Sequence, residues 1–364
     1  MRKLGISIYP EKSTKSELYA YIDRAAAAGF SRIFSCLLSV TEDKDSIKQN
    51  FTEMNSYAKQ KGFEIIVDVS PRVFDELGIS YQDLTFFKEI GADGVRLDAG
   101  YSGSEESIMT FNPQGLMIEI NMSNDTHYID TIMDYMPNRY QLIGCHNFYP
   151  HNYSGLTLEH FWKCTENFKK HGLRTAAFIT SQTEGSFGPW PVTDGLPTLE
   201  MHRHLPLYLQ LEHFITMGTI DDIIISNCFP SEEELESVTG LRLDMTTFHV
   251  ELINDLPQIE TDIVLNELHF NRGDVSENFL RSTQSRVKYK GHTFARLHTP
   301  EIIHRGDVVI ESSDYGHYAG ELQIAKADMI NSGKSNVVGQ IPQEEHFLLD
   351  MIRPWQKFCF RNVK

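Results

Sequence analysis

Polar and charged residues recur in this sequence where short apolar runs end. They are Asp68 in EIIVDVSP, Arg96 and Asp98 in GVRLDAG, Glu119 and Asn121 in MIEINMSND, His146 and Asn147 in QLIGCHNFYP, Thr180 and Gln182 in RTAAFITSQ, and Asn227 in DIIISNCFP. A buried parallel strand carries apolar side chains on both faces, so charges within it are costly unless they point into a functional opening. We therefore predict that these residues line an active site at the carboxyl ends of successive strands.

Two same-face pairs indicate what chemistry these residues could do. Arg96 and Asp98 are two positions apart, as are Glu119 and Asn121, so each pair projects from one face of its strand. An arginine beside Asp98 favours the ionised carboxylate. Carboxyl groups on neighbouring strands can then serve as acid, base or nucleophile, with amides beside them to bind a polar substrate.

The elements that must position these residues are β-then-α units. Apolar runs alternate with helical patterns eight times between residue 4 and about residue 240. The first helix opens at Ser16 and stops at Gly29, and the second spans about 45–61. Eight such units predict a (β/α)8 TIM barrel over residues 1–240. The alternative is a doubly wound open sheet, but the first turn, Tyr9 to Ser13, contains neither G-x-G-x-x-G nor a Walker A loop.

Two further segments differ from the repeating units. Residues 183–206 form a connection rich in Gly, Pro and aromatic residues, and we expect an ordered loop packed over the barrel mouth. From residue 243 to 364, runs such as MTTFHVELI, DIVLNELHFNRGD, HTFARLHT and GDVVIESS follow one another without long helices. These runs predict a smaller all-β domain, a small barrel.

With these segments in view, the chain resembles the bacterial 6-phospho-N-acetylmuramidases. The resemblance rests on LGISIYPE, GVRLDAG, EINMSND, CHNFYP and TEGSFGPWPVTDGLPTLE-x-HR, and it extends over essentially the whole chain. It implies a cyclophilin-like second domain and hydrolysis of 6-phospho-N-acetylmuramic acid–N-acetylglucosamine disaccharides during peptidoglycan recycling. The cyclophilin likeness concerns shape alone, because the stretch that carries prolyl isomerase activity has no counterpart here.

Glycoside hydrolysis typically uses two carboxyl groups, whose separation decides the stereochemical outcome. The preferred catalytic pair is Asp98 with Glu119, one as acid or acid/base and the other as nucleophile or base. The alternative for each is a salt bridge at the rim. An N-acetyl sugar also allows attack by its own acetamido oxygen. In that route His146, Asn147, Tyr149 and Asn121 would orient the amide or bind the sugar; the alternative for His146 is a hydrogen-bonded core histidine.

The remaining candidates concern sugar and phosphate binding. A phosphosugar needs cationic or amide donors. The phosphate candidates are Arg96, then His202, Arg203 and His204 at the start of the helix after the long loop, and Arg296 and Arg305 from the second domain. The whole predicted substrate-binding set is Asp68, Arg96, Asn121, His146, Asn147, Tyr149, Thr180, Gln182, Glu184, Asp194, Glu200, Arg203 and Asn227.

Composition limits the partners and the alternatives. The net charge of −17 over 364 residues argues against nucleic acid and anionic membranes. Five scattered cysteines, the lack of a signal peptide and the lack of an 18-residue apolar run predict a reduced, cytoplasmic protein. We expect no metal and no cofactor; a homo-oligomer and a catalytic thiol at Cys145 or Cys228 stay open. The rival functions are a phosphosugar isomerase, epimerase or aldolase, although no lysine stands at a strand end, and a non-catalytic protein that binds cell-wall fragments.

Overall fold

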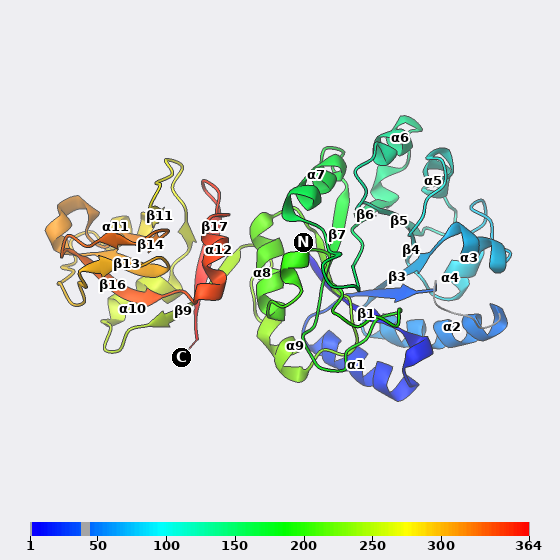
Figure 1. Cartoon of the computed structure of the whole chain (residues 1–364), viewed down its shortest axis with the longest axis horizontal. Coiled ribbons are helices and arrows are strands. Elements are labelled where there is room, and N and C mark those ends of the chain that lie inside the picture. Colours follow the sequence, from blue (N-terminus) through cyan, green and yellow to red (C-terminus); the bar gives the residue numbers. More distant parts are fainter. Residues whose placement is uncertain (1, 38–43, 364) are drawn as a thin grey trace. The chain divides into compact units, whose positions relative to one another are not determined.

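The protein is described by a computed structural model, which covers residues 2–37 and 44–363. Its first part is a closed barrel of eight parallel strands, each hydrogen-bonded to the next, with β8 returning to β1 (Figure 1). The strands are β1 (Lys3–Ile8), β2 (Arg32–Cys36), β3 (Glu64–Val69), β4 (Gly94–Leu97), β5 (Met117–Asn121), β6 (Leu142–Cys145), β7 (Arg174–Ile179) and β8 (Asp222–Ile225). The predicted TIM barrel is therefore confirmed.

The helices of this part follow the strands in the predicted order. They are α1 (Lys15–Ala27), α2 (Lys44–Gln60), α3 (Pro71–Glu76), α4 (Thr85–Glu89), α5 (Ser104–Met109), α6 (Tyr128–Asp134), α7 (Leu158–Lys169), α8 (Leu207–Met217) and α9 (Glu232–Val238). Local sequence fixes several ends: Thr14 with Glu17, and Ser231 with Glu234, form capping boxes that satisfy the first free backbone N–H groups of α1 and α9.

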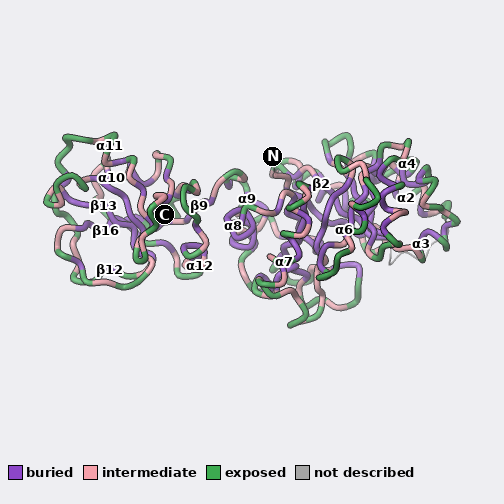
Figure 2. The backbone as a smooth tube through the Cα atoms, turned by 90° about the horizontal axis from the view of Figure 1, so that it is seen from above, coloured by how far each residue is buried: buried purple, intermediate pink, exposed green. Residues whose placement is uncertain are grey.

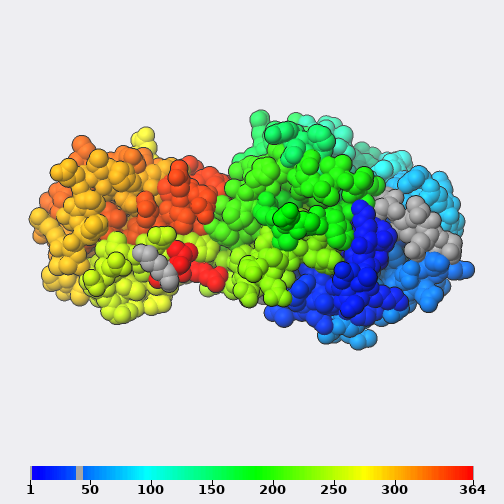
Figure 3. All heavy atoms as spheres, turned by 60° about the horizontal axis from the view of Figure 1, so that its bottom comes forward, coloured from blue at the N-terminus to red at the C-terminus, as the bar shows by residue number. Residues whose placement is uncertain are grey.

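The barrel core lies between the strands and the surrounding helices. Ile33, Ile65 and Ile223 are fully buried on their strands, and Leu18 and Phe161 pack inward from α1 and α7. Figure 2 shows the strands as a buried centre within more exposed segments. Figure 3 shows the N-terminal segment (blue) beside green segments of the chain, and Nζ of Lys12 donates to the carbonyl of Gly188 at 2.7 Å.

The last third of the chain forms a mostly antiparallel sheet of seven strands in the order β10-β17-β9-β16-β13-β14-β11. These strands are β9 (Thr246–Leu252), β10 (His269–Phe270), β11 (Phe279–Ser282), β13 (Asp307–Glu311), β14 (Leu322–Ala325), β16 (Ser335–Gln340) and β17 (Lys357–Asn362), and β12 (Ile302–Ile303) pairs separately with β15 (Met329–Ile330). The outer strands β10 and β11 approach each other, and the N–H of Arg272 donates to the carbonyl of Arg281 at 3.0 Å. The sheet therefore curls into a barrel-like form.

Two details of this second part differ from the prediction. Residues within the run DIVLNELHFNRGD form helix α10 (Gln258–Asn266) and not a strand, because Pro257 starts a helix and its apolar residues Ile263 and Val264 pack on one side. The run HTFARLHT forms no regular strand. Helices α11 (Gln284–Lys288) and α12 (His346–Leu349) also accompany the sheet.

By internal contacts the chain divides into two compact units. One comprises residues up to 240 without 215–217, and the other comprises 215–217 together with 241–364. The strand-end residues listed from the sequence all belong to the first unit.

Candidate active site

Arg96 organises the carboxyl-end rim of the barrel. Its Nη1 lies 2.5 Å from Oδ1 of Asp68 and 3.3 Å from Oδ1 of Asp98. Its Nη2 donates to Oδ1 of Asn147. These residues come from β3, from β4 and the position just after it, and from the segment after β6. The structure thus brings together four of the predicted residues around one guanidinium group.

The two carboxyl groups on this arginine have opposite environments. The side chain of Asp98 is 42% exposed, whereas that of Asp68 is 5% exposed. Burial raises the pKa of Asp68 to about 7, the neighbouring Arg96 opposes this rise, and the Asp98 carboxylate adds to it. Asp68 is therefore partly protonated near neutral pH while Asp98 faces the solvent, an arrangement suited to acid–base chemistry.

Glu119 lies deeper in the barrel than Asp98. Its side chain is fully buried and forms an ion pair with Arg32, which also pairs with Asp222. Arg32 on β2 reaches β5 and β8, which are not its neighbours in the sheet, so these contacts cross the barrel interior. Oε1 of Glu119 lies 4.0 Å from Nε of Arg96, too far for a direct hydrogen bond. The two carboxyls that meet at the rim are Asp98 and Asp68, with Glu119 beneath them.

Amide and aromatic groups surround this rim cluster. Asn121 donates from Nδ2 to the carbonyl of Asp98 at 3.1 Å. Burial raises the pKa of Tyr149, partly opposed by a hydrogen bond with the Ser123 side chain, and Arg96 and Asp98 lie within electrostatic range of its ring. Asn121, Asn147 and Tyr149 are half-buried. All three lie near Arg96 or Asp98.

His146 has the position that the core alternative predicted. Its ring is fully buried and stacks on Phe161 of α7 at a centroid distance of 4.4 Å. Nδ1 lies 3.2 Å from the Ser123 hydroxyl and Nε2 lies 2.9 Å from the Thr165 hydroxyl. Burial lowers its pKa to about 3, so the ring is neutral. The ring's partners in the structure are thus Ser123, Thr165 and Phe161, as expected of a hydrogen-bonded core histidine.

The predicted residues after β7 and β8 hold the long loop. Oγ1 of Thr180 accepts from the N–H of Leu196 at 2.9 Å. Nδ2 of Asn227 donates to Ser186 at 2.7 Å, and Nε2 of Gln182 donates to the carbonyl of Arg203 at 3.1 Å. Thr180 and Asn227 are buried, and their side chains hold the loop. Only Gln182 is exposed among these three.

Glu200 and Arg203 form the second anchor of the loop. Both oxygens of Glu200 accept from Arg203, at 2.7 and 2.6 Å, and Oε2 also accepts from the N–H of Gly155. The pairing with Arg203 lowers the pKa of Glu200 to about 2. Nη1 of Arg203 donates to the carbonyls of Tyr149, Asp194 and Gly195, and its side chain is 1% exposed. Arg203 therefore binds the protein's own groups, and its guanidinium anchors the loop.

The other predicted loop and phosphate residues take varied positions. Asp194 accepts from the N–H of Asn152 at 3.3 Å, and Glu184 is exposed. His202 precedes α8 and is buried against His213, with 2.7 Å between ring nitrogens. His204 is exposed. Arg296 and Arg305 belong to the second unit, where they pair with Asp314 and Asp350.

Glu234 is a residue whose role the sequence analysis missed. TIM barrels often bind phosphate after strands 7 and 8, near a helix N-terminus. Here the carboxylate of Glu234 accepts there from the N–H of Gln182 at 2.6 Å and from the Thr183 hydroxyl at 2.7 Å. The Ser231–Glu234 capping box was a visible signal. A protein carboxylate thus occupies the anion position that this fold commonly offers.

The sequence analysis also did not identify Phe148 and Thr198 as residues of this site. The ring of Phe148 meets Phe34 and Phe178 edge-on at 6.0 and 5.1 Å, so it covers the apolar side of the barrel interior beside Asn147. The hydroxyl of Thr198 donates to the carbonyl of Asn147 at 2.8 Å. The long loop is therefore tied directly to the residue that supports Arg96.

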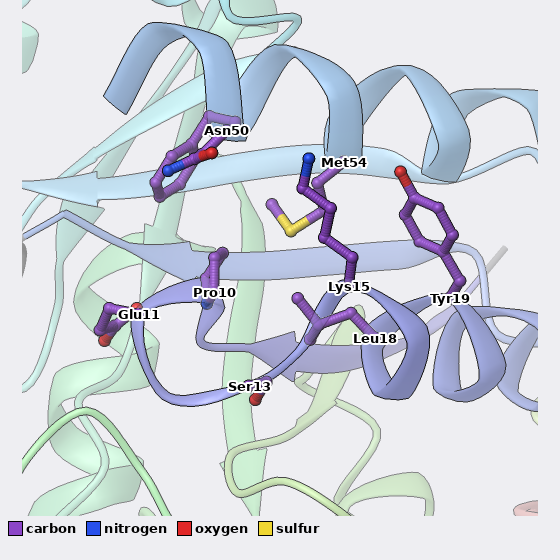
Figure 4. A pocket seen from close by; sticks show the side chains of 9 residues that line it. Pro10, Glu11, Ser13, Lys15, Leu18, Tyr19, Asn50 and Met54 are labelled. Carbon is purple, nitrogen blue, oxygen red and sulfur yellow. The ribbon is translucent and has the colours of Figure 1, made fainter. Parts of the chain in front are cut away.

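A separate pocket of about 180 Å³ lies between α1, α2 and the segment after β1 (Figure 4). Pro10, Ser13, Leu18 and Met54 are among its lining residues, and none of the Arg96 cluster lines it. Within residues 2–37 and 44–363, no group of three or more His, Cys, Asp or Glu side chains is placed to hold a metal ion. Among the same residues, no helix is both long and apolar enough to cross a membrane.

The closed parallel barrel, with its carboxyls and amides at the carboxyl-end rim, defines an enzyme of the (β/α)8 class. The family model for the 6-phospho-N-acetylmuramidase N-terminal domain matches residues 4–240, and the model for its C-terminal domain matches residues 246–361. The chain therefore belongs to the 6-phospho-N-acetylmuramidase family, and it is a glycosidase.

Solved structures agree with this membership. An uncharacterised protein of B. cereus is 47% identical, with 99% of each chain covered and a TM-score of 0.90. A conserved protein of unknown function from Enterococcus faecalis is 23% identical, covers 99% of this chain and 96% of its own, and has a TM-score of 0.71. No protein with a curated description matches the chain.

Proposed function

We propose that this protein hydrolyses the glycosidic bond between 6-phospho-N-acetylmuramic acid and N-acetylglucosamine, in disaccharides recovered from peptidoglycan. Membership of the family supports the reaction and its substrate class. The observation that carries the chemistry is the pair of carboxyls on one nitrogen of Arg96, one buried and one exposed. Of the two residues predicted from the sequence to be catalytic, Asp98 keeps that role in this proposal.

The proposed roles of the two carboxyls follow from their environments. Asp68, with a pKa near 7, donates its proton to the leaving oxygen as the bond to the anomeric carbon breaks. Asp98 is the exposed carboxylate and either attacks that carbon or orients the substrate's acetamido oxygen for attack. A water molecule then gives a proton to Asp68 and attacks the anomeric carbon with its oxygen. The bond from that carbon to Asp98, or to the acetamido oxygen, breaks as the new bond forms. Asp68 thereby replaces Glu119 as the partner of Asp98.

The separation of the carboxyls favours retention of configuration. The two Oδ1 atoms lie 2.5 and 3.3 Å from the same nitrogen, so their distance cannot exceed the sum of these values. Retaining glycosidases hold their carboxyls about 5–5.5 Å apart, and inverting ones about 6.5–9.5 Å. Nuclear magnetic resonance of the first product formed should show the anomeric configuration of the substrate; the opposite configuration would contradict this carboxyl pair.

The experiment that tests the function is incubation with the phosphorylated disaccharide. We expect equal amounts of N-acetylglucosamine and 6-phospho-N-acetylmuramic acid, and far slower cleavage of the disaccharide without phosphate. An isomerised but intact product would indicate the isomerase class, and binding without turnover would indicate a binding protein. Either result would reject the proposal.

A further inference from the structure

The barrel interior contains a chain of charged side chains that runs from the amino-end opening to the rim. We call it the interior charged column. Lys3 and Arg174 pair with Glu64 at 3.0 and 2.6 Å, and Arg174 also pairs with Asp222 at 2.7 Å. Arg32 connects Asp222 to Glu119, and Arg96 follows, 4.0 Å from Glu119, with Asp68 and Asp98 above it.

The column has one acidic group more than it has basic groups. Its four basic side chains are Lys3, Arg32, Arg96 and Arg174, and its five acidic side chains are Glu64, Asp68, Asp98, Glu119 and Asp222. An unpaired charge inside a barrel is costly, so such a group tends to become neutral by binding a proton. Lys3, Arg32 and Arg174 match Glu64, Glu119 and Asp222 in number, so the excess lies at the rim, where Arg96 faces both Asp68 and Asp98. The buried carboxyl of these two, Asp68, is the one expected to bind a proton.

We propose that the buried Arg32–Glu119 pair is the positioning element that places this proton on Asp68. The proposal rests on the function proposed above and deepens it, since it explains how the barrel maintains an acid at the rim. Glu119 never touches substrate in this account. It acts through Arg96, which lies between it and the two rim carboxyls.

Geometry shows why Asp68 is the carboxyl that stays neutral. Glu119 is matched by Arg32, and Asp98 is 42% exposed, so water stabilises its charge. Asp68 is buried and shares Arg96 with Asp98 and, at longer range, with Glu119. The groups that face Asp68 are Cys36 of β2, whose Sγ lies 3.8 Å from Oδ2, then Arg96, Asp98 and Glu119. Arg96 is thus shared by three carboxyl groups, those of Asp68, Asp98 and Glu119.

The two residues of the positioning pair, Arg32 and Glu119, are both fully buried and form an ion pair with each other. Arg32 is fully buried; burial alone would lower its pKa, but Glu119 and Asp222 outweigh burial and raise it. Removing Glu119 would free Arg96 to stabilise an ionised Asp68, and removing Arg32 would do the opposite. Removing both leaves the column with the same excess of one acidic group.

The test is a titration of Asp68 by carbon-13 nuclear magnetic resonance of labelled aspartate, in the absence of substrate. Glu119→Gln should lower the pKa of Asp68 by about one, a tenfold change in the ratio of protonated to ionised form. Arg32→Gln should raise it, and Arg32→Gln with Glu119→Gln should return it close to the wild-type value. Glu64→Gln is the matched control, since it removes the same charge at the far end of the column and should leave Asp68 nearly unchanged.

Wild-type protein supplies a second measurement if a single variant does not fold. Between pH 5 and 8 the Asp68 signal should move. A flat Asp68 signal in the wild type, an unchanged Asp68 in Glu119→Gln, or an equal effect of Glu64→Gln would overturn the inference.

The kinetic consequence separates this inference from the proposed function. A general acid works only while protonated, so in Glu119→Gln the decline of kcat/KM at alkaline pH should begin about one pH unit lower. Cleavage with an unshifted profile would reject the positioning role and keep the muramidase. Absence of cleavage in the wild type, with the predicted Asp68 titration, would reject the function and keep the charge coupling.

Discussion

Replacing Asp68 by asparagine should make the protein less active and more stable at the same time. Burial raises the pKa of this carboxyl from 3.8 to about 7. Since one pKa unit corresponds to about 1.4 kcal/mol, the ionised carboxyl costs the folded state about 4 kcal/mol above pH 7. Asparagine keeps an oxygen that can accept from Arg96 but carries no charge.

The sign of the pH dependence follows from the raised pKa. Below about pH 4 the carboxyl is protonated in both the folded and the unfolded protein, so the wild type bears no penalty. As the pH rises from 4 to 7, the unfolded chain ionises first and the folded protein loses stability relative to it. The advantage of Asp68→Asn in free energy of unfolding should therefore grow from near zero at pH 4 to about 4 kcal/mol at pH 8.

Denaturant unfolding at several pH values measures this difference, and kinetics measure the loss of the acid. Removal of a general acid typically costs about 10²–10⁴ in rate. A substrate whose leaving group needs no proton, such as a nitrophenyl glycoside, should lose far less. Asp68→Leu serves as a control that removes the carboxyl and also the acceptor for Arg96.

Two results would refute the reasoning. Equal stability of Asp68→Asn and wild type at pH 4 and at pH 8 would mean that the carboxyl is not a buried acid. A full loss of rate on the nitrophenyl substrate would mean that Asp68 does not act by protonating the leaving group.

Three further predictions follow from the same contacts. Asp98→Asn should lower kcat by about 10³ or more, which a steady-state assay measures. The melting temperature should change little in a thermal melt, because the side chain of Asp98 is 42% exposed. Arg203→Met should leave Glu200 without its cation and loosen the loop at residues 183–206. KM should then rise, and hydrogen exchange in the loop should increase. Unchanged protection of the loop from exchange would contradict the anchoring role of Arg203. His146→Asn should destabilise the fold by about 1–3 kcal/mol through loss of the ring's buried hydrogen bonds with Ser123 and Thr165, yet leave the pH profile of kcat/KM unchanged between pH 6 and 8.

The strands and the rim could be predicted because their signals are local. Apolar runs, glycine stops and capping residues gave the eight units, and residues at the ends of adjacent strands had to meet. Asp68, Arg96 and Asp98 come together for this reason, since β3 and β4 pair with Asp68 opposite Arg96.

Depth within the barrel could not be predicted in the same way. Arg96 and Glu119 are register partners, yet one supports the rim and the other pairs with Arg32 across the interior. The contact between Arg32 and Glu119 depends on how the strands tilt around the closed barrel, and this tilt cannot be read from the sequence of one strand. A signal was nevertheless present, because Arg32, Glu64, Arg174 and Asp222 are charges at the starts of apolar strands.

The roles of His146 and Arg203 were obscured by another ambiguity. A polar residue after a strand can face the mouth or turn toward a helix or loop, and alternation alone does not decide this once the strand has ended. His146 turned toward α7, and Arg203 toward backbone carbonyls of the loops. Both positions satisfy buried polar groups, which is the commoner reason for such residues to be inside.

The most direct test of the central claim is a single assay of wild type, Asp98→Asn and Asp68→Asn with the phosphorylated disaccharide. We expect the wild type to release N-acetylglucosamine and 6-phospho-N-acetylmuramic acid in equal amounts, and both variants to be slower by at least about a hundredfold. Unchanged disaccharide with the wild type, or near-wild-type release by both variants, would contradict the account.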